Sequence, residues 1–148
     1  MLVYRISMAH RANSLSASGY PGRWNSKGKF VIYSAASIAL ACLENVVHRS
    51  GEGLAANFKV ITIHIPDKLK IKKVSVDELP IDWHMIENYV ITQRMGNLWL
   101  EKSETAILKI PSAIIPLETN YLINPFHPDF KKIKIKNVDD FIFDPRIK

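Results

Sequence analysis

Short runs of alternating apolar and polar residues recur along the chain, while only two stretches carry a helical period. The clearest run, Phe58–Ile65, alternates up to Pro66 and predicts a strand that ends there. Strand-like runs also lie at 2–7, 30–34, 69–74, 105–110, 113–115, 132–136 and 140–144, helical stretches at 38–49 and 86–104, and short helical turns after residues 77 and 125. Because strands and helices do not alternate strictly, this order predicts an α/β (α+β) fold with a mixed, mainly antiparallel sheet flanked by helices.

The length of 148 residues suits one domain, which we expect to span residues 1–148. Hydrophobic residues make up 47% of the chain and charged residues 23%, a balance that excludes a disordered chain. No apolar run is long enough for a transmembrane helix, and Met1–Arg5 lacks the pattern of a signal peptide. Cys42 is the only cysteine, which excludes an internal disulfide and a cysteine zinc site. We therefore expect a cytoplasmic protein.

Basic residues are concentrated in the first half of the chain. Residues 1–74 carry eleven basic and three acidic groups, whereas residues 75–148 carry nine and eleven. Such asymmetry is typical of a surface that meets a polyanion such as nucleic acid, a phosphorylated metabolite or a membrane. The lysines of 68–73 have a second interpretation, which is that they only keep an exposed strand soluble. For Lys132, Lys134 and Lys136 we favour protection of an edge strand over phosphate binding.

The segment 9–29 is rich in Ser, Asn, Gly and Pro and predicts a long irregular loop, which in a small domain is more often functional than a plain connector.

The helix predicted at 38–49 carries an acidic residue on the face that its pattern predicts to be packed and apolar. Leu40, Leu43 and Val47 share its apolar face, and Glu44 lies in the same sector. An acid on a packed face indicates either a functional carboxylate or a glutamate paired with a structural arginine. We expect this helix to be capped by Ser34 or Ser37 and to end before Gly51.

Several familiar motifs are not supported. Residues 51–56 match the pattern G-x-G-x-x-A, but the helix precedes them and a strand follows, the reverse of a dinucleotide-binding turn. No ligand spacing links the histidines, which are His10, His48, His64, His84 and His127, so no metal site is predicted. The serines Ser34, Ser37 and Ser112 have no nucleophile-elbow context.

One group of residues remains, and it combines a cation, an aromatic ring and a carboxylate. Arg23 lies in the flexible loop, Tyr33 at the end of the next strand, and Glu44 on the helix that leaves that strand. All three can converge over one end of the sheet, and Arg5 at the end of the first strand can join them.

These residues lie within stretches that resemble the RES-domain proteins, the toxin components of bacterial toxin–antitoxin pairs. The matching stretches are 3–5, 22–28, 31–34, 39–44, 111–113, 120–125, 127–130 and 143–146, in the family's order. One departure is Tyr20-Pro21-Gly22, where the family commonly has paired glycines before the arginine. This departure stiffens the loop and puts substrate entry in question, but it leaves the arginine in place.

The resemblance implies a fold like the ADP-ribosyltransferases and cleavage of NAD between nicotinamide and ribose. It assigns catalytic roles to Arg23, Tyr33, Glu44 and Ser112, and NAD contacts to Tyr4, Arg5, Arg23, Trp24, Tyr33 and Asn120. NAD is then a substrate rather than a cofactor, and the acceptor of ADP-ribose is phosphate, water or a protein. The expected partner is an Xre-like helix-turn-helix antitoxin that occludes the active site, so that DNA contact belongs to the partner.

The chemistry of these side chains suits those roles. The guanidinium group of an arginine binds pyrophosphate through two parallel hydrogen bonds, and a carboxylate stabilises the positive charge that develops on the ribose. Structural alternatives stay open: Trp24 as a core anchor, Tyr33 as a core tyrosine, Ser112 as a turn cap and Arg5 in a pair with Asp144. Ser112 can also orient Glu44 or a ribose hydroxyl. The alternative function is a non-catalytic basic module that binds nucleic acid, although no recognition-helix motif is present.

Overall fold

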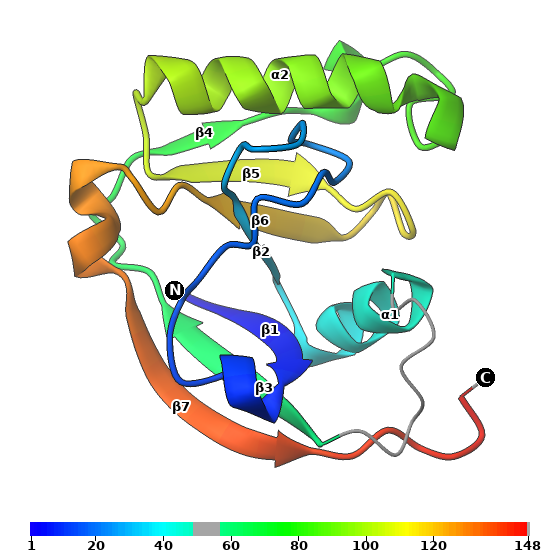
Figure 1. Cartoon of the computed structure of the whole chain (residues 1–148). Coiled ribbons are helices and arrows are strands. Elements are labelled where there is room, and N and C mark those ends of the chain that lie inside the picture. The colour runs from blue at the N-terminus through cyan, green and yellow to red at the C-terminus, as the bar shows by residue number, and fades with distance from the viewer. Residues whose placement is uncertain (49–56, 148) are drawn as a thin grey trace.

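A seven-stranded sheet with the order β4-β5-β6-β2-β1-β3-β7 organises the computed structural model, which describes residues 1–48 and 57–147 (Figure 1). Its strands are β1 Leu2–Met8, β2 Ile32–Ala35, β3 Phe58–His64, β4 Ile71–Lys73, β5 Ile107–Pro111, β6 Thr119–Ile123 and β7 Lys134–Phe141. The pair of β4 and β5 is parallel, and the other neighbouring pairs are antiparallel. The predicted fold class, a mixed and mainly antiparallel sheet with helices, is therefore confirmed.

Two strand predictions near the C-terminus are wrong. Residues 113–115 form a turn, because the Ser112 hydroxyl oxygen accepts the backbone N–H groups of Ile114 and Ile115 and bends the chain. The strand of this region is instead β6, which the sequence analysis did not assign. The predicted strand at 140–144 is also not separate, since β7 continues without a break to Phe141.

The two long helices lie where they were predicted. Helix α1 spans Ile38–His48, and the Ser37 hydroxyl accepts the N–H of Leu40, so Ser37 is the cap. Helix α2 spans Tyr89–Lys102 after a short 3-10 turn at Ile86–Asn88. Further 3-10 turns are Ala9–Arg11, Val76–Glu78 and Pro128–Lys132. The expected helix end at Gly51 and the motif at 51–56 lie outside the described residues.

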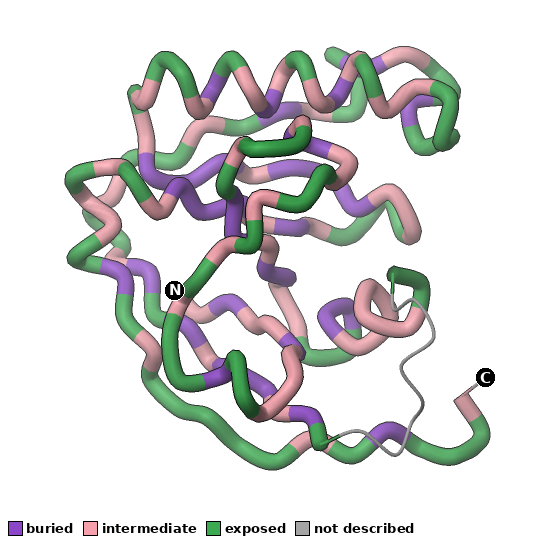
Figure 2. The backbone as a smooth tube through the Cα atoms, in the orientation of Figure 1, coloured by how far each residue is buried: buried purple, intermediate pink, exposed green. Residues whose placement is uncertain are grey.

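Buried residues lie on both faces of the sheet along its central strands, whereas the edge strand β7 is mostly exposed (Figure 2). One face carries two apolar clusters, with α2 over the half that contains β4 and β5, and α1 beside β1 and β2 (Figure 1). The cluster under α2 is built around Trp24, Trp83 and Trp99. The opposite face carries a third cluster, rich in isoleucine, under the chain segment around Ala12. This arrangement leaves room for a cleft between the two helices.

Helix α2 approaches the long loop so closely that only glycine fits at position 96. A Cβ at Gly96 would overlap the backbone carbonyl oxygen of Trp24. On the same helix Trp99 is buried, whereas Leu98 is 48% exposed. Among the described residues, no helix has the length and apolar character needed to cross a membrane.

Candidate active site

A cleft of about 490 Å³ lies on the face of the sheet that carries the two helices. Its walls come from β1, β2, α1, the start of α2 and the loop around residues 18–24. Its lining contains the predicted Tyr4, Arg5, Arg23, Trp24, Tyr33, Glu44 and Asn120. The cleft therefore brings together the loop arginine, the strand tyrosine and the helix glutamate, which lie far apart in the sequence.

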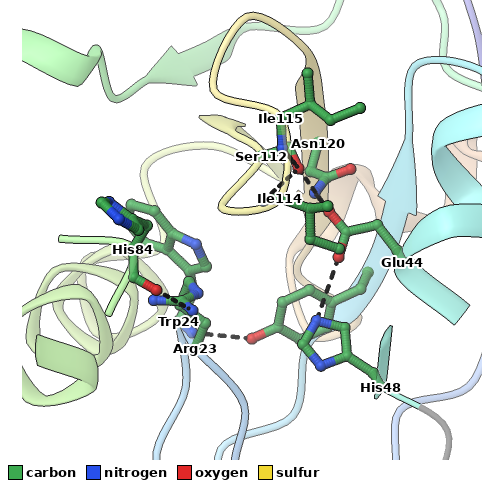
Figure 3. A network of polar contacts seen from close by, with 10 residues as sticks. Arg23, Trp24, Glu44, His48, His84, Ser112, Ile114, Ile115 and Asn120 are labelled. Atoms are coloured by element: carbon green, nitrogen blue, oxygen red, sulfur yellow. Dashed lines mark hydrogen bonds and ion pairs between the residues drawn. The ribbon is translucent and has the colours of Figure 1, made fainter. Parts of the chain in front are cut away.

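Glu44 is fixed at one side of the cleft by two neutral donors (Figure 3). Its Oε1 accepts the hydroxyl of Ser112 at 2.8 Å and the amide Nδ2 of Asn120 at 2.5 Å. Its Oε2 faces Nε2 of His48 at 3.3 Å, one helical turn further along α1. The alternative of a glutamate paired with a structural arginine is not found, since among the described residues His48 is the basic side chain in ion-pair distance of this carboxylate.

These contacts keep Glu44 ionised. Burial of the carboxyl raises its pKa, but the contacts with His48, Asn120 and Ser112 lower it by more, so the pKa lies below its ordinary value. The side chain is 22% exposed, enough to meet a ligand in the cleft. Of the residues predicted on the apolar face of α1, Leu40 is buried, whereas Val47 is 55% exposed and gives the carboxylate no apolar shielding.

Ser112 is fully buried and holds Glu44 rather than a ligand. A serine hydroxyl has one hydrogen and two lone pairs. Because its oxygen accepts the N–H groups of Ile114 and Ile115, its hydrogen is directed to Glu44. Of the two roles considered for Ser112, orienting Glu44 fits this geometry, and contacting a ribose hydroxyl does not. The turn-cap interpretation is correct at the same time.

Arg23 lies across the cleft and is held by the turn that precedes α2. Its Nη1 donates to the carbonyl of Trp83 at 3.0 Å. Its Nη2 donates to the carbonyl of His84 at 2.7 Å (Figure 3). The guanidinium also stacks on the ring of Tyr89, 4.2 Å from the ring centroid. Each terminal nitrogen of Arg23 therefore already donates to a backbone carbonyl. What Arg23 presents to the cleft is mainly a fixed positive charge rather than two unbound donor nitrogens.

The Tyr33 hydroxyl is fully engaged, although its residue lines the cleft. It donates to Oδ1 of Asn25 at 2.6 Å and accepts the N–H of Trp24 at 3.1 Å. Burial raises the pKa of Tyr33, and the charges of both Arg23 and Glu44 reach this hydroxyl. The interpretation of Tyr33 as a tyrosine with a satisfied hydroxyl is correct, so what remains for a ligand is its ring.

Gly22 and Asn25 make this arrangement possible. A Cβ at Gly22 would lie 2.7 Å from the Tyr33 hydroxyl oxygen, so any larger residue would push the ring away. Asn25 is 2% exposed, and its Nδ2 donates to the carbonyls of Tyr20 and Lys29, which holds the loop together. The buried Asn25 amide is therefore one of the contacts that order the predicted irregular loop.

The remaining predicted contacts differ in what they present to the cleft. Arg5 donates from Nη1 to the carbonyl of Ser16, and burial together with nearby Arg11 lowers its pKa. Its expected alternative partner was Asp144, but that carboxylate pairs with Arg146. The Trp24 side chain is only 1% exposed and packs in the core, so the interpretation of Trp24 as a core anchor is correct.

Sequence reasoning missed His48, Asn25 and the carbonyls of the turn at 83–85. The spacing of four residues between Glu44 and His48 on a helix was a signal for the first, because such residues are neighbours on the helix surface. The others give no sequence signal, since they depend on contacts between distant segments. Within residues 1–48 and 57–147, no three His, Cys, Asp or Glu side chains are grouped as a metal site would need.

Comparison with known proteins identifies the family of this chain. A family model described as the RES domain matches residues 2–144. The "Prs ADP-ribosylating toxin" of Sphingobium sp. is 39% identical over 143 residues, which cover 93% of this chain and 89% of the relative. "Toxin Res" of Photorhabdus laumondii is 35% identical and is covered to 97%, with 99% of this chain aligned.

A solved structure shares the fold. A chain in the crystal structure of the M. tuberculosis MbcT–MbcA toxin–antitoxin complex superimposes with a TM-score of 0.77 at 19% identity. The match covers 95% of this chain and 84% of that chain. With a family model that matches nearly the whole length and relatives that are named toxins, the chain belongs to the RES-domain family of toxins.

Proposed function

We propose that this protein is the toxin of a toxin–antitoxin pair and that it cleaves the bond between nicotinamide and ribose in NAD. The observation that carries the proposal is the Glu44 carboxylate, held ionised in a cleft that two arginines and a tyrosine ring also line. A fixed anion suits a cationic transition state, and guanidinium groups suit a pyrophosphate. Two relatives named as toxins support the same assignment.

In this reaction the bond between the ribose carbon and the nicotinamide nitrogen breaks, and its electron pair stays on nitrogen. The nicotinamide ring thereby loses its positive charge and leaves as a neutral molecule. Positive charge develops on the ribose, as in the oxocarbenium-like transition state of glycoside cleavage. Oε2 of Glu44 stabilises this charge, directly or through the ribose hydroxyls, while Oε1 stays bound to Ser112 and Asn120.

The two arginines act differently on the dinucleotide. Arg5 uses one N–H for the Ser16 carbonyl, so most of its donors remain available to the pyrophosphate. Arg23 has both terminal nitrogens on backbone carbonyls and contributes mainly its charge. The ring of Tyr33 offers a face for the nicotinamide or the ribose.

The experiment is to incubate purified protein with NAD and to measure released nicotinamide. We expect Glu44→Gln to abolish release while the protein stays folded, because glutamine keeps the shape but not the charge. Glu101→Gln is the matched control, since Glu101 lies on α2 in an exposed pair with Lys29. Release at the wild-type rate by the Glu44 variant would overturn the proposal.

The acceptor of ADP-ribose is decided by the same incubation with and without inorganic phosphate, with products identified by mass. ADP-ribose 1″-phosphate indicates phosphorolysis, and free ADP-ribose indicates hydrolysis. A relative named for ADP-ribosylation of Prs suggests a third arm, in which a cell extract is added and the mass increase of a protein is measured. In each case the acceptor oxygen or nitrogen forms the new bond to the ribose carbon.

The proposal includes an antitoxin that covers the cleft. The structural relative was solved in a toxin–antitoxin complex, and in the present chain Tyr20 lines the cleft while remaining 75% exposed. The expected partner is an Xre-like helix-turn-helix protein encoded beside this gene. Its co-purification with the toxin, together with loss of nicotinamide release, tests this part.

The alternative of a basic module that binds nucleic acid has less support. The lysines of β4 and those of β7 lie on strands at opposite ends of the sheet order and cannot form one stripe with each other. Nucleic-acid affinity that falls steeply with salt, without NAD turnover, would favour this alternative.

A further inference from the structure

The two oxygens of the Glu44 carboxylate have different contacts. Oε1 accepts hydrogen bonds from Ser112 and Asn120, whose residues are 0% and 9% exposed. Oε2 has neither of these donors and faces His48 (Figure 3). If Glu44 acts on the ribose, Oε2 is the atom that does so.

The hydrogen bonds of Ser112 and Asn120 restrain the Glu44 carboxylate from the side of Oε1. Rotation about the last bond of a glutamate side chain is soft, because terminal sp³–sp² torsions have broad wells. Such a rotation moves both oxygens through the same angle, so the donors on Oε1 already restrain it in part. A further contact on Oε2 narrows the rotation and the range of positions that Oε2 takes.

His48 is placed to do this. It lies four residues after Glu44 on α1, its Nε2 is 3.3 Å from Oε2, and it lines the cleft. A neutral imidazole carries one N–H, and a nitrogen that faces a carboxylate oxygen carries it, so Nε2 is the donor whether the ring is neutral or charged. An oxygen with two lone pairs can accept this contact and a ribose hydroxyl together.

The cleft offers no other described candidate for this task. Its remaining titratable lining residues are Tyr4, Arg5, Tyr20, Arg23, Tyr33 and Tyr89. None of these groups has a hydrogen bond or ion pair with the Glu44 carboxylate in the described part of the chain, and the Arg23 guanidinium and the Tyr33 hydroxyl are bound elsewhere. Within the described part of the chain, His48 is the basic group that contacts the Glu44 carboxylate.

We propose that His48 is a positioning residue that holds Oε2 of Glu44 toward the ribose, acting through Glu44 rather than on the substrate. The role rests on the proposed function for its kinetic consequence, but the contact itself can be tested without NAD. A residue that aligns a catalytic group affects the chemical step more than substrate binding.

The experiment compares His48→Leu, which removes the donor, with His48→Gln, whose amide can donate to the same oxygen. Val47→Leu is the matched control, because Val47 is the preceding residue of α1, is 55% exposed like the His48 side chain, and does not line the cleft. We expect His48→Leu to lower kcat for nicotinamide release about tenfold with KM nearly unchanged, since one charge-assisted hydrogen bond is lost. Glutamine should restore most of kcat, and the Val47 variant should match wild type.

A second readout needs no substrate. Titration of the Glu44 side-chain carboxyl by carbon-13 NMR should give a higher pKa in His48→Leu than in wild type, because the contact that lowers it is gone. An unchanged kcat in His48→Leu overturns the proposal, and so does an equal loss in the leucine and glutamine variants. If wild type releases no nicotinamide, the proposed function fails, and the titration alone then decides whether His48 holds Glu44: an unchanged Glu44 pKa refutes the contact.

Discussion

Replacing Gly96 by alanine tests how the scaffold holds the site. The new Cβ would overlap the Trp24 carbonyl oxygen and lie 2.9 Å from its carbonyl carbon, where carbon atoms normally stay about 3.5–4.0 Å apart. The loop cannot simply withdraw, because Trp24 is 1% exposed and α2 itself binds the loop through Thr92 and Gln93. The backbone of the loop must shift by about one ångström or more to clear the carbonyl oxygen.

The expected cost follows from three contributions. Overpacking costs about 1–3 kcal/mol, and weakening of the Thr92 hydrogen bond to the Arg23 carbonyl adds about 1 kcal/mol. The better helix propensity of alanine returns about 1 kcal/mol. We therefore expect the free energy of unfolding to fall by about 2 kcal/mol, and nicotinamide release to fall with it because Arg23 moves.

Urea unfolding of wild type and Gly96→Ala measures this difference as a shift of the midpoint at constant slope. Leu98→Ala is the control for an ordinary change on the same helix, since Leu98 is 48% exposed and should change stability by less than about 0.5–1 kcal/mol. A Gly96→Ala protein as stable as wild type would refute the reasoning, because helix propensity would then outweigh the predicted collision.

Three further predictions concern stability. Thr92→Val removes the hydroxyl that donates to the Arg23 carbonyl at 2.6 Å, and we expect a loss of about 1–2 kcal/mol in urea unfolding. Ser103→Gly should raise stability by about 0.5–1 kcal/mol, because Ser103 ends α2 with a positive φ of 48° that glycine adopts without strain; a thermal midpoint no higher than wild type would contradict this. Since the pKa of Glu44 is lowered by folding, its contribution is present above the ordinary value of 4.5 and is lost as the pH falls through the lower folded value. The stability advantage of wild type over Glu44→Gln should therefore shrink on acidification below pH 4.5, and an advantage that grows there would show that the sign is wrong.

The local elements were largely predictable from the sequence because they depend on periodicity and capping. The alternation of β3, the cap of α1 at Ser37 and the long loop with its turn formers all follow from nearby residues. The prediction failed where a side chain overrides the pattern. Residues 113–115 have the composition of a strand, but the buried Ser112 hydroxyl binds two backbone N–H groups there and forms a turn.

Glu44 was identified from the sequence because a carboxylate on the apolar face of a helix is costly to bury without a purpose. Its partners were not all identifiable in the same way. Ser112 and Asn120 lie 68 and 76 residues away, and only the pairing of β6 with β2 and β5 brings them to α1. The local pattern identifies Glu44 alone, and Ser112 and Asn120 were candidates only through the family resemblance.

What the sequence determined by itself was therefore both long helices, most of the strands, the mixed architecture and the presence of an unusual acid on α1, because the local pattern of nearby residues indicates each of these. The tertiary structure alone decided how the charged groups are used. It engages both terminal nitrogens of Arg23 with the turn at 83–85, buries the Trp24 ring in the core, and gives the two oxygens of Glu44 different partners. The physical reason is that hydrogen bonds and burial depend on distance in space, and distant segments acquire their spatial neighbours only when the sheet has formed.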